Sequence, residues 1–415
     1  MLRSLRVRNY RLYAGGQLIS LTGTWMQRVA QDWLVLELTN SGTALGVVTA
    51  LQFGPALLLG MYGGMLADRG NKRRLLFATQ TLMGLTALLL GVLTLTGVVQ
   101  YWHVLAIALA FGLVAAVDSP IRQSFVVEMV GKDELTNAVG INSTIFNAAR
   151  IVGPAVAGVM ISAVGTGWAF VVNAASSVAV LAAIAAMNEK ELFPAPAVAR
   201  AKGQLREGLR YVRGRSDLLL TMILVFIIGT FGLNFQITSA LMAKQVFHHG
   251  ASGYGLLSTM LAVGACIGAV IATTRTRKPR MMFLIGAALT FSVLEIVSGV
   301  MPTFLATALV LVPTGLAMLS LTTAANASVQ LGVEPTMRGR VMALYLTCFM
   351  GGTPLGAPIV GWLAGVAGPR WGLVGGGLIC LVATLALGAV FARQGGVTRA
   401  DMTGRLHLHP ALSQQ

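Results

Sequence analysis

Five charged residues lie inside long apolar stretches of the sequence, where an isolated charge is costly. They are the acids Asp32, Asp118 and Glu295 and the bases Arg28 and Arg150. A charge at the centre of a bilayer costs about 2.5–3.5 kcal/mol on insertion scales, and such residues usually face a partner or a water-filled pathway. These residue types therefore predict charge pairing or proton transfer inside an apolar environment.

Arg28 and Asp32 are four positions apart, so on a helix they share one face, which Trp25 also occupies. The spacing permits an ion pair, which would lessen the insertion cost of both residues. Two interpretations stay open: a static pair that neutralises itself, or a carboxylate whose proton affinity changes as a cavity opens to either side. Asp32 is the first choice for the protonated group, with Arg28 and Arg150 as its charge partners.

Asp118 and Arg122 repeat this spacing nearer one end of their stretch. That position favours a gate or helix-pinning role over contact with a substrate. Arg150 has Asp32 and Asp118 as its only acidic candidates in the first half of the chain, and the sequence does not choose between them. Glu295 is equally compatible with a peripheral glutamate that faces a neighbouring helix and with a second proton site.

Other chemistry finds little support. The chain has no G-x-x-x-x-G-K-[ST] loop, which argues against an ATP-driven pump. No histidine lies in the interior of an apolar stretch, since His103 stands at the edge of one, so a proton relay must use carboxylates, and neither an enzyme nor a resident metal or cofactor is expected. The pair His407-x-His409 raises metal-ion export as a smaller alternative. The remaining histidines are His103, His248 and His249, and the cysteines, which lack metal-ligand spacing, are Cys266, Cys348 and Cys380.

The apolar stretches that carry these charges are predicted to be membrane-spanning helices. The 415 residues are 55% hydrophobic and only 11% charged, whereas soluble proteins carry about 25% charged residues. Apolar runs of the length that spans a bilayer exclude a soluble enzyme, a secreted scaffold and a disordered tail. The sequence predicts an all-α polytopic membrane protein with twelve spans, at about 10–36, 42–67, 75–97, 102–125, 136–164, 167–187, 218–240, 253–274, 281–301, 303–330, 340–365 and 370–392.

The positions of the basic residues predict the orientation. The net charge is +16, with 30 Lys and Arg residues. With both termini on one side, the loops of the opposite side hold only Lys244 and Arg370. By the positive-inside rule both termini are cytoplasmic, in a cell (inner or plasma) membrane. The basic charge is thus a topology signal and does not support nucleic-acid binding.

One long hydrophilic segment divides the chain into two halves of six spans each. The predicted parts are an N-terminal half (1–187), a basic cytoplasmic linker (188–217), a C-terminal half (218–393) and a cytoplasmic tail (394–415). A weak internal repeat supports the division, since a constant offset relates Phe146, Gly153 and Gly158 to Phe349, Gly356 and Gly361. Two matched halves are typical of transporters that rock around a central site.

The loop between the second and third predicted spans carries a resemblance. Its sequence, GMLADRGNKRR from Gly64 to Arg74, resembles the signature loop G-x-L-A-D-R-x-G-R-K of the major facilitator superfamily. Asn71 replaces the usual glycine, a mild departure because asparagine tolerates the left-handed conformation. The resemblance implies a gating role for this loop, carried by Gly64, Asp68, Arg69, Lys72 and Arg73.

The fifth predicted span resembles the exporter motif of the same superfamily, g-x8-G-x3-GP-x2-GG. Gly140, Gly153, Pro154 and Gly158 occupy motif positions, and Ala149 and Ala157 replace two of its glycines. The resemblance implies a closely packed, kinked helix that favours outward transport. An ordinary helix-packing motif is the alternative, because small residues four apart serve any helix interface.

Further segments resemble the branch that holds the enterobactin exporter, macrolide efflux proteins and related secretion effectors; they lie at 118–125, 147–150, 206–212 and 338–343. The resemblance implies a fold of two pseudo-symmetric six-helix halves, present as a monomer in the lipid bilayer. It also implies a proton-coupled antiporter that exports a small amphipathic or lipophilic compound, either drug-like or siderophore-like. Proton-coupled uptake by a symporter is the alternative. The substrate-cavity candidates are Trp25, Gln27, Gln31, Asn142, Asn147, Asn234, Gln236 and Asn326.

Overall fold

The structure is a computed structural model of the chain and describes residues 3–193, 204–273 and 279–393. In these residues it contains helices and no strand, which confirms the predicted all-α class. The first helices are α1 (Arg8–Thr39), α2 (Gly42–Arg69), α3 (Lys72–Leu95), α4 (Tyr101–Val130), α5 (Leu135–Val164) and α6 (Thr166–Ala185). The later helices are α7 (Gln204–Arg213), α8 (Ser216–Ile227), α9 (Phe235–Leu241), α10 (Ala251–Thr273), α11 (Met281–Val300), α12 (Phe304–Gly332), α13 (Arg338–Ala367) and α14 (Pro369–Arg393).

Eleven helical segments of the described residues are long and apolar enough to cross a membrane. Helix α1 is not among the eleven, although its 32 residues are enough to span a bilayer. It buries a series of polar side chains, including Gln17, Gln27, Gln31 and Asp32, which lower its hydropathy. The polytopic membrane fold is therefore confirmed, and a twelfth crossing by α1 stays a prediction.

The seventh predicted span is longer and less regular than 218–240. It runs over Ser216–Val246 and joins α8 and α9 through a π-helical turn at Ile228–Gly232, with a second π-helical turn at Met242–Val246. Wider turns of this kind recur at functional sites, because each leaves backbone groups outside the regular ladder. Hydropathy alone does not register such turns, since the side chains on them remain mostly apolar.

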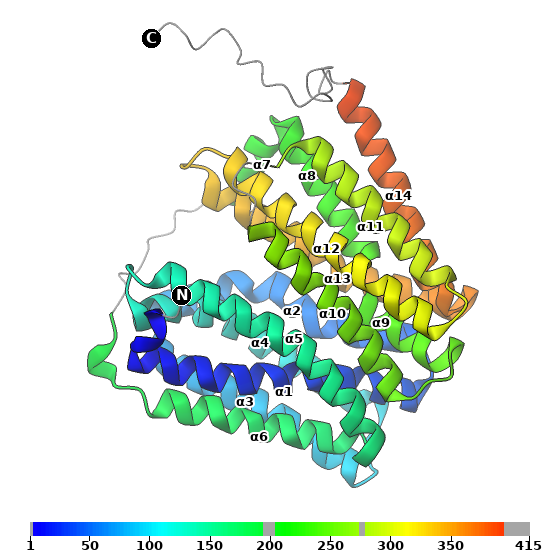
Figure 1. Cartoon of the computed structure of the whole chain (residues 1–415). Coiled ribbons are helices and arrows are strands. Elements are labelled where there is room, and N and C mark those ends of the chain that lie inside the picture. The colour runs from blue at the N-terminus through cyan, green and yellow to red at the C-terminus, as the bar shows by residue number, and fades with distance from the viewer. Residues whose placement is uncertain (1–2, 194–203, 274–278, 394–415) are drawn as a thin grey trace, which may run out of the picture.

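The helices form two groups that face each other (Figure 1). In the first group α1 packs on α5 and α6, α3 on α4 and α6, and α2 on α4. In the second group α12 packs on α10 and α11, and α14 on α11 and α13. The main contacts between the groups are α2 with α13 and α5 with α10. The boundaries proposed for the two halves, the linker and the tail stay predictions.

The groups are held together at one end, which we call the sealed end and define by Leu36, Asn40, Lys244 and Gln245. Lys244 Nζ donates a hydrogen bond to the carbonyl oxygen of Leu36 at 2.5 Å, and Gln245 Nε2 donates to that of Asn40 at 3.1 Å. Backbones also meet there, because a Cβ atom added to Gly361 of α13 would overlap the start of α2.

The opposite end, where α1, α3 and α13 begin at Arg8, Lys72 and Arg338, is called the basic end. In Figure 1 the two groups diverge toward the end where the N terminus lies. Among the described residues, no hydrogen bond joins the groups at the basic end; those that do join them involve Lys244, Gln245 and Tyr254. The fold is therefore closed at the sealed end and looser at the basic end.

Candidate functional site

A cavity of about 300 Å³ lies between the two groups of helices. Its first wall comes from α1, α2 and α5 and carries its two charged residues, Arg28 and Arg150. The second wall comes from α9, α10, α12 and α13 and carries hydroxyl, amide and aromatic groups. Residues that line the cavity include Trp25, Phe53 and Pro154 on the first wall and Phe235, Gln236, Ser239, Tyr254, Ser258, Met318, Thr322, Phe349 and Thr353 on the second.

The two arginines of the first wall share an aromatic neighbour. Arg28 Cζ lies 4.7 Å from the ring centroid of Trp25 and 5.3 Å from that of Phe53, and Arg150 Cζ lies 5.9 Å from that of Trp25. Cation–π contacts of this kind stabilise a guanidinium group without neutralising it. Within the part of the chain that the structure describes, neither arginine forms an ion pair, and the buried Nε of Arg28 has no hydrogen-bond partner.

Asp32 is bound to the other group of helices. Tyr254 of α10 donates a hydrogen bond from its hydroxyl to Oδ2 of Asp32 at 2.7 Å. Both side chains are buried, and Tyr254 also lines the cavity. The ion pair that the Arg28–Asp32 spacing permits is absent from the described residues. Tyr254 is not among the site residues predicted from the sequence, where its one signal is a polar side-chain tip within an apolar stretch.

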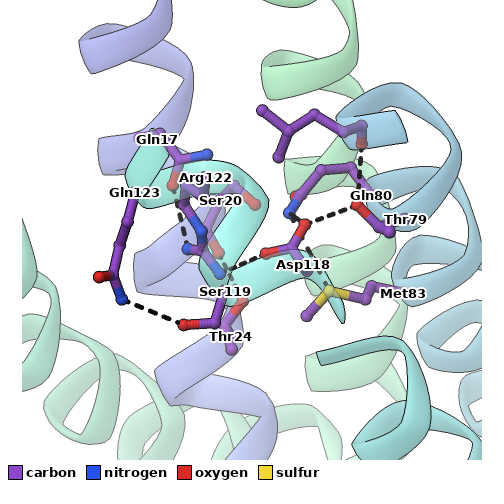
Figure 2. A network of polar contacts seen from close by, with 11 residues as sticks. Gln17, Ser20, Thr24, Thr79, Gln80, Met83, Asp118, Ser119, Arg122 and Gln123 are labelled. Atoms are coloured by element: carbon purple, nitrogen blue, oxygen red, sulfur yellow. Dashed lines mark hydrogen bonds and ion pairs between the residues drawn. The ribbon is translucent and has the colours of Figure 1, made fainter. Parts of the chain in front are cut away.

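Asp118 is the centre of a saturated polar network in the first group (Figure 2). Its Oδ1 accepts hydrogen bonds from Thr79 at 2.6 Å and Gln80 at 2.9 Å, and its Oδ2 pairs with Arg122 at 2.5 Å. Arg122 also donates to Gln17 Oε1 at 3.4 Å. The network joins α1, α3 and α4 and lies outside the central cavity. Its geometry fits a helix-pinning role, because every acceptor oxygen of the carboxylate is already bound.

Glu295 lies inside the second group and outside the cavity lining. Its side chain is 2% exposed, and Oε2 has no hydrogen-bond partner among the described residues. Two glycines make room for the carboxylate: a Cβ atom on Gly232 would lie 3.2 Å from Oε2, and one on Gly376 would lie 3.2 Å from Oε1. Glu295 therefore faces the π-helical turn of the seventh span and α14.

The gating-loop residues whose side chains the structure describes make their polar contacts within the first group of helices. Lys72 pairs with Glu128 of α4. Arg73 pairs with Glu189, and it donates to carbonyl oxygens at the end of α6 at 2.8 Å. Both residues therefore hold α3 to its neighbours at the basic end. Gly64 is buried in α2, and the side chains of Asp68 and Arg69 lie outside the described residues.

Residues of the exporter motif allow α5 to approach two other helices. A Cβ atom on Gly153 would lie 2.5 Å from Cβ of Trp25 on α1. One on Gly158 would lie 3.0 Å from Cα of Ser252 on α10, across the interface between the groups. At Gly140 an added Cβ would meet nothing within 4 Å. Gly153 and Gly158 thus have a steric requirement for glycine that Gly140 lacks.

The substrate-cavity candidates divide into two sets. Trp25 and Gln236 line the cavity, as does Pro154 of the exporter motif. The others lie outside its lining, and four of these six are hydrogen-bonded within the protein, to another helix or within their own span. Gln27 accepts from Asn173, Asn142 from Tyr10, and the amides of Asn147 and Asn234 donate to carbonyl oxygens of their own helices; Gln31 and Asn326 complete this set.

Metal chemistry finds no support in the part of the chain that the structure describes. No group of three or more His, Cys, Asp or Glu side chains there could hold a metal ion. The three cysteines are free and lie apart on different helices. The tail that contains His407 and His409 lies outside the described residues.

Two groups of membrane-spanning helices around a central, partly charged cavity define a secondary transporter of the major facilitator superfamily. The chain belongs to the transmembrane secretion effector family, whose sequence profile matches residues 2–414. It is a multi-pass membrane protein, and its family and relatives are transporters.

Several characterised relatives are bacterial efflux proteins. The chain is 25% identical to the multidrug efflux pump Tap of Mycobacterium tuberculosis over 85% of this chain and 86% of that protein. It is 20% identical to macrolide efflux protein A of Streptococcus pyogenes over 91% and 95% of the two chains. It is 26% identical to the staphyloferrin A transporter of Staphylococcus aureus, in an alignment that spans 60% of this chain and only 63% of that protein.

Solved structures share the fold at low sequence identity. The peptide transporter POT aligns with a TM-score of 0.75 at 13% identity, covering 92% of this chain and 94% of that one. A bacterial homologue of the human lysosomal transporter Spinster, in an inward-facing conformation, aligns with a TM-score of 0.71 at 15% identity, covering 97% and 99% of the two chains.

Proposed function

We propose that this protein is a proton-coupled antiporter that exports a small amphipathic organic compound by alternating access. The two groups of helices rock about the central cavity, which is exposed to one side of the membrane at a time. The efflux activity named for Tap and for macrolide efflux protein A supports the outward direction. Monomeric function and the coupling ion are parts of the same proposal.

The proposed orientation makes the described conformation inward-facing. The positive-inside rule assigns the basic end, and with it both termini, to the cytoplasm. The sealed end then faces outward, closed by Lys244, Gln245 and the contact between α2 and α13. A compound from the cytoplasm or the inner leaflet would enter at the basic end and reach the arginines of the first wall.

One observation carries the proton coupling: the hydrogen bond from Tyr254 to Asp32. It joins the two groups beside the cavity, on the side toward the sealed end. An ionised carboxylate accepts this hydrogen bond more strongly than a neutral one. The bond therefore holds the empty, deprotonated carrier closed to the outside, and this suppresses futile cycling.

Protonation of Asp32 from the outside completes the proposed cycle. When the outer end opens, Tyr254 separates from Asp32 and water reaches the carboxylate. As that end closes again, an ionised carboxylate would lose its water before Tyr254 can donate to it, and burying the unpaired charge is unfavourable in an apolar interior. A proton on Asp32 removes this cost and is carried inward. It is then released to the cytoplasm through the basic end, and the ionised carboxylate of Asp32 again accepts a hydrogen bond from Tyr254.

The test uses inverted membrane vesicles with an imposed pH gradient. The transported compound is first identified by comparing resistance to drugs, dyes and siderophores in a transporter-deleted strain with and without this chain. Wild-type protein should accumulate that compound in proportion to the gradient, and Asp32→Asn should abolish the gradient-driven component. Glu295→Gln is the matched control, because it also neutralises a buried carboxylate but lies away from the cavity.

Two outcomes would overturn parts of the proposal. Unchanged gradient-driven accumulation in Asp32→Asn would show that Asp32 does not carry the coupled proton. Accumulation by right-side-out cells, with none in wild-type inverted vesicles, would reverse the direction and identify a proton-coupled uptake protein.

A further inference from the structure

The central cavity has an excess of positive charge that the protein does not balance. Arg28 and Arg150 both line it, and no acidic side chain of the described residues does. Asp32, the acid nearest to Arg28 in sequence, is buried behind the lining and bound to Tyr254. The net charge of Arg28, Arg150 and Asp32 is +1 when Asp32 is ionised and +2 when Asp32 is protonated.

A second arginine in the same group of helices, Arg122, shows how a guanidinium charge is balanced by a carboxylate. Arg122 lies at the same four-residue spacing from Asp118 as Arg28 from Asp32, but its guanidinium is paired at 2.5 Å. Arg28 makes cation–π contacts but no ion pair among the described residues, and its buried Nε has no acceptor there. Buried charged donors are otherwise paired almost without exception, so this arrangement points to an acceptor supplied by a ligand.

The geometry favours an acceptor with several oxygens. The two guanidinium groups approach one indole ring, with Cζ atoms 4.7 and 5.9 Å from its centroid, so their free N–H groups converge on the space beside Trp25. Planar guanidinium groups bind carboxylate or phosphate oxygens with paired N–H donors. Aromatic and aliphatic side chains around them, such as Phe53, Phe349 and Met318, offer an apolar surface to the rest of the compound.

We propose that the transported compound is an organic anion, in which a carboxylate, sulfonate or phosphate group on an apolar body is bound by Arg28 and Arg150. This inference rests on the proposed function only in taking the cavity as the transport site. It narrows the substrate class and excludes lipophilic cations as preferred substrates. A membrane potential that is negative inside favours both exit of an anion and entry of a proton, so exchange of the two is driven in one direction.

The test compares three compounds with one aromatic body and different charge. N-dansylglycine is anionic at neutral pH, its methyl ester is neutral, and N-dansylethylenediamine is cationic. Binding to the full-length protein in uncharged dodecyl maltoside is measured by equilibrium dialysis. Charge-assisted hydrogen bonds predict a Kd for the anion about ten- to a hundredfold lower than for the other two compounds.

Substitutions of Arg28 and Arg150 test whether these two residues cause the preference for the anion. Arg28→Gln and Arg150→Gln should each lose most of the preference for the anion, and Arg28→Lys should keep part of it. Arg11→Gln is the matched control, because Arg11 lies exposed on α1 at the basic end. Unchanged binding of the methyl ester and an unchanged gel-filtration profile verify that each variant is folded.

Each result decides the inference. It fails if the wild-type protein binds the cation or the ester as tightly as the anion, or if the preference survives the double change of Arg28 and Arg150 to Gln. Displacement of N-dansylglycine by phosphatidylglycerol in mixed micelles, with the same dependence on the arginines, would support the anion class and identify a lipid as the source of the group.

The proposed function is tested separately, because the binding measurement uses no proton gradient. Anion preference without gradient-driven accumulation would overturn the antiport and leave the anion class in place. Gradient-driven transport that continues at the wild-type rate in the double arginine variant would overturn the anion class and leave the antiport in place.

Discussion

The hydroxyl group of Tyr254 lies 2.7 Å from Oδ2 of Asp32, and the two residues are 222 positions apart in the chain. The bond joins α1 to α10, which belong to different groups of helices. Both residues lie on the side of the cavity toward the sealed end. Any movement that opens this end must break the bond, and this makes it a direct link between the state of a carboxylate and the conformation of the protein.

Replacing the tyrosine tests this link. Tyr254→Phe removes a hydrogen bond to a carboxylate, worth about 1.5–3 kcal/mol when the acceptor is ionised. We expect the sealed end to open more often. The measurement is the rate at which a membrane-impermeant maleimide, added from the sealed side, labels Ser258→Cys, a cavity residue, after replacement of Cys266, Cys348 and Cys380 by alanine.

The control for this variant is Tyr13→Phe. Tyr13 is equally buried, but its hydroxyl has no hydrogen-bond partner among the described residues and lies away from the interface between the groups. An equal labelling rate in Tyr254→Phe and in the parent protein would disprove a role for the bond in sealing.

Lys244 should contribute to the same seal from the second group. Its Nζ donates to the carbonyl oxygen of Leu36 at 2.5 Å, close to the ring of Trp33. Lys244→Met keeps the length of the side chain and removes the donor, so labelling from the sealed side should again accelerate. Lys132→Met, at an exposed position, should leave the rate unchanged. A slower rate in Lys244→Met would contradict the proposed seal.

The glycines of α5 should differ in their tolerance of alanine. In Gly158→Ala the new methyl group would lie 3.0 Å from the backbone of Ser252, so α5 and α10 must separate. Overpacking of this kind costs about 1–3 kcal/mol, and we expect a lower unfolding temperature in detergent together with slower transport. Gly140→Ala meets nothing within 4 Å and should be neutral or stabilising by about 0.5–1 kcal/mol. Equal effects at the two positions would refute the steric argument.

The Asp118 network should contribute to stability more than to transport specificity. Asp118→Asn leaves Arg122 without its ion-pair partner, and breaking a buried pair costs about 3–5 kcal/mol. We expect the lower end, because Arg122 is 27% exposed and the new amide oxygen still accepts hydrogen bonds. Glu189→Gln removes an ion pair whose acid is 55% exposed and should change stability by less than about 1 kcal/mol. Thermal unfolding in detergent compares the two.

The sequence predicted the helices well because hydropathy is a local property. An apolar run such as 281–301 becomes α11, Met281–Val300, almost residue for residue. The run predicted at 102–125 became α4, Tyr101–Val130, because the helix continues through residues 126–130 beyond the predicted end. The π-helical turns of Ser216–Val246 had no signal, since they depend on packing against other helices.

The site shows the same limit at the level of single residues. Asp118–Arg122 and Arg28–Asp32 have identical spacing on their helices, yet only the first pair forms an ion pair in the described residues. Asp32 instead accepts from Tyr254, and Arg28 lies against Trp25 and Phe53. Spacing gives two side chains the same face of a helix, but the residues of other helices decide which contact each one makes.

Composition and local patterning were enough to predict the class of the protein, the approximate spans and the charged residues that need an explanation, because the cost of a charge in an apolar segment depends on that segment alone. Which of those charges are balanced depends instead on how the helices pack against one another. That packing places Asp118 in a saturated network, Asp32 in a bond between the groups, and Arg28 and Arg150 at the cavity without an ion pair among the described residues. These partners come from helices far apart in the chain, so their meeting depends on how whole helices pack.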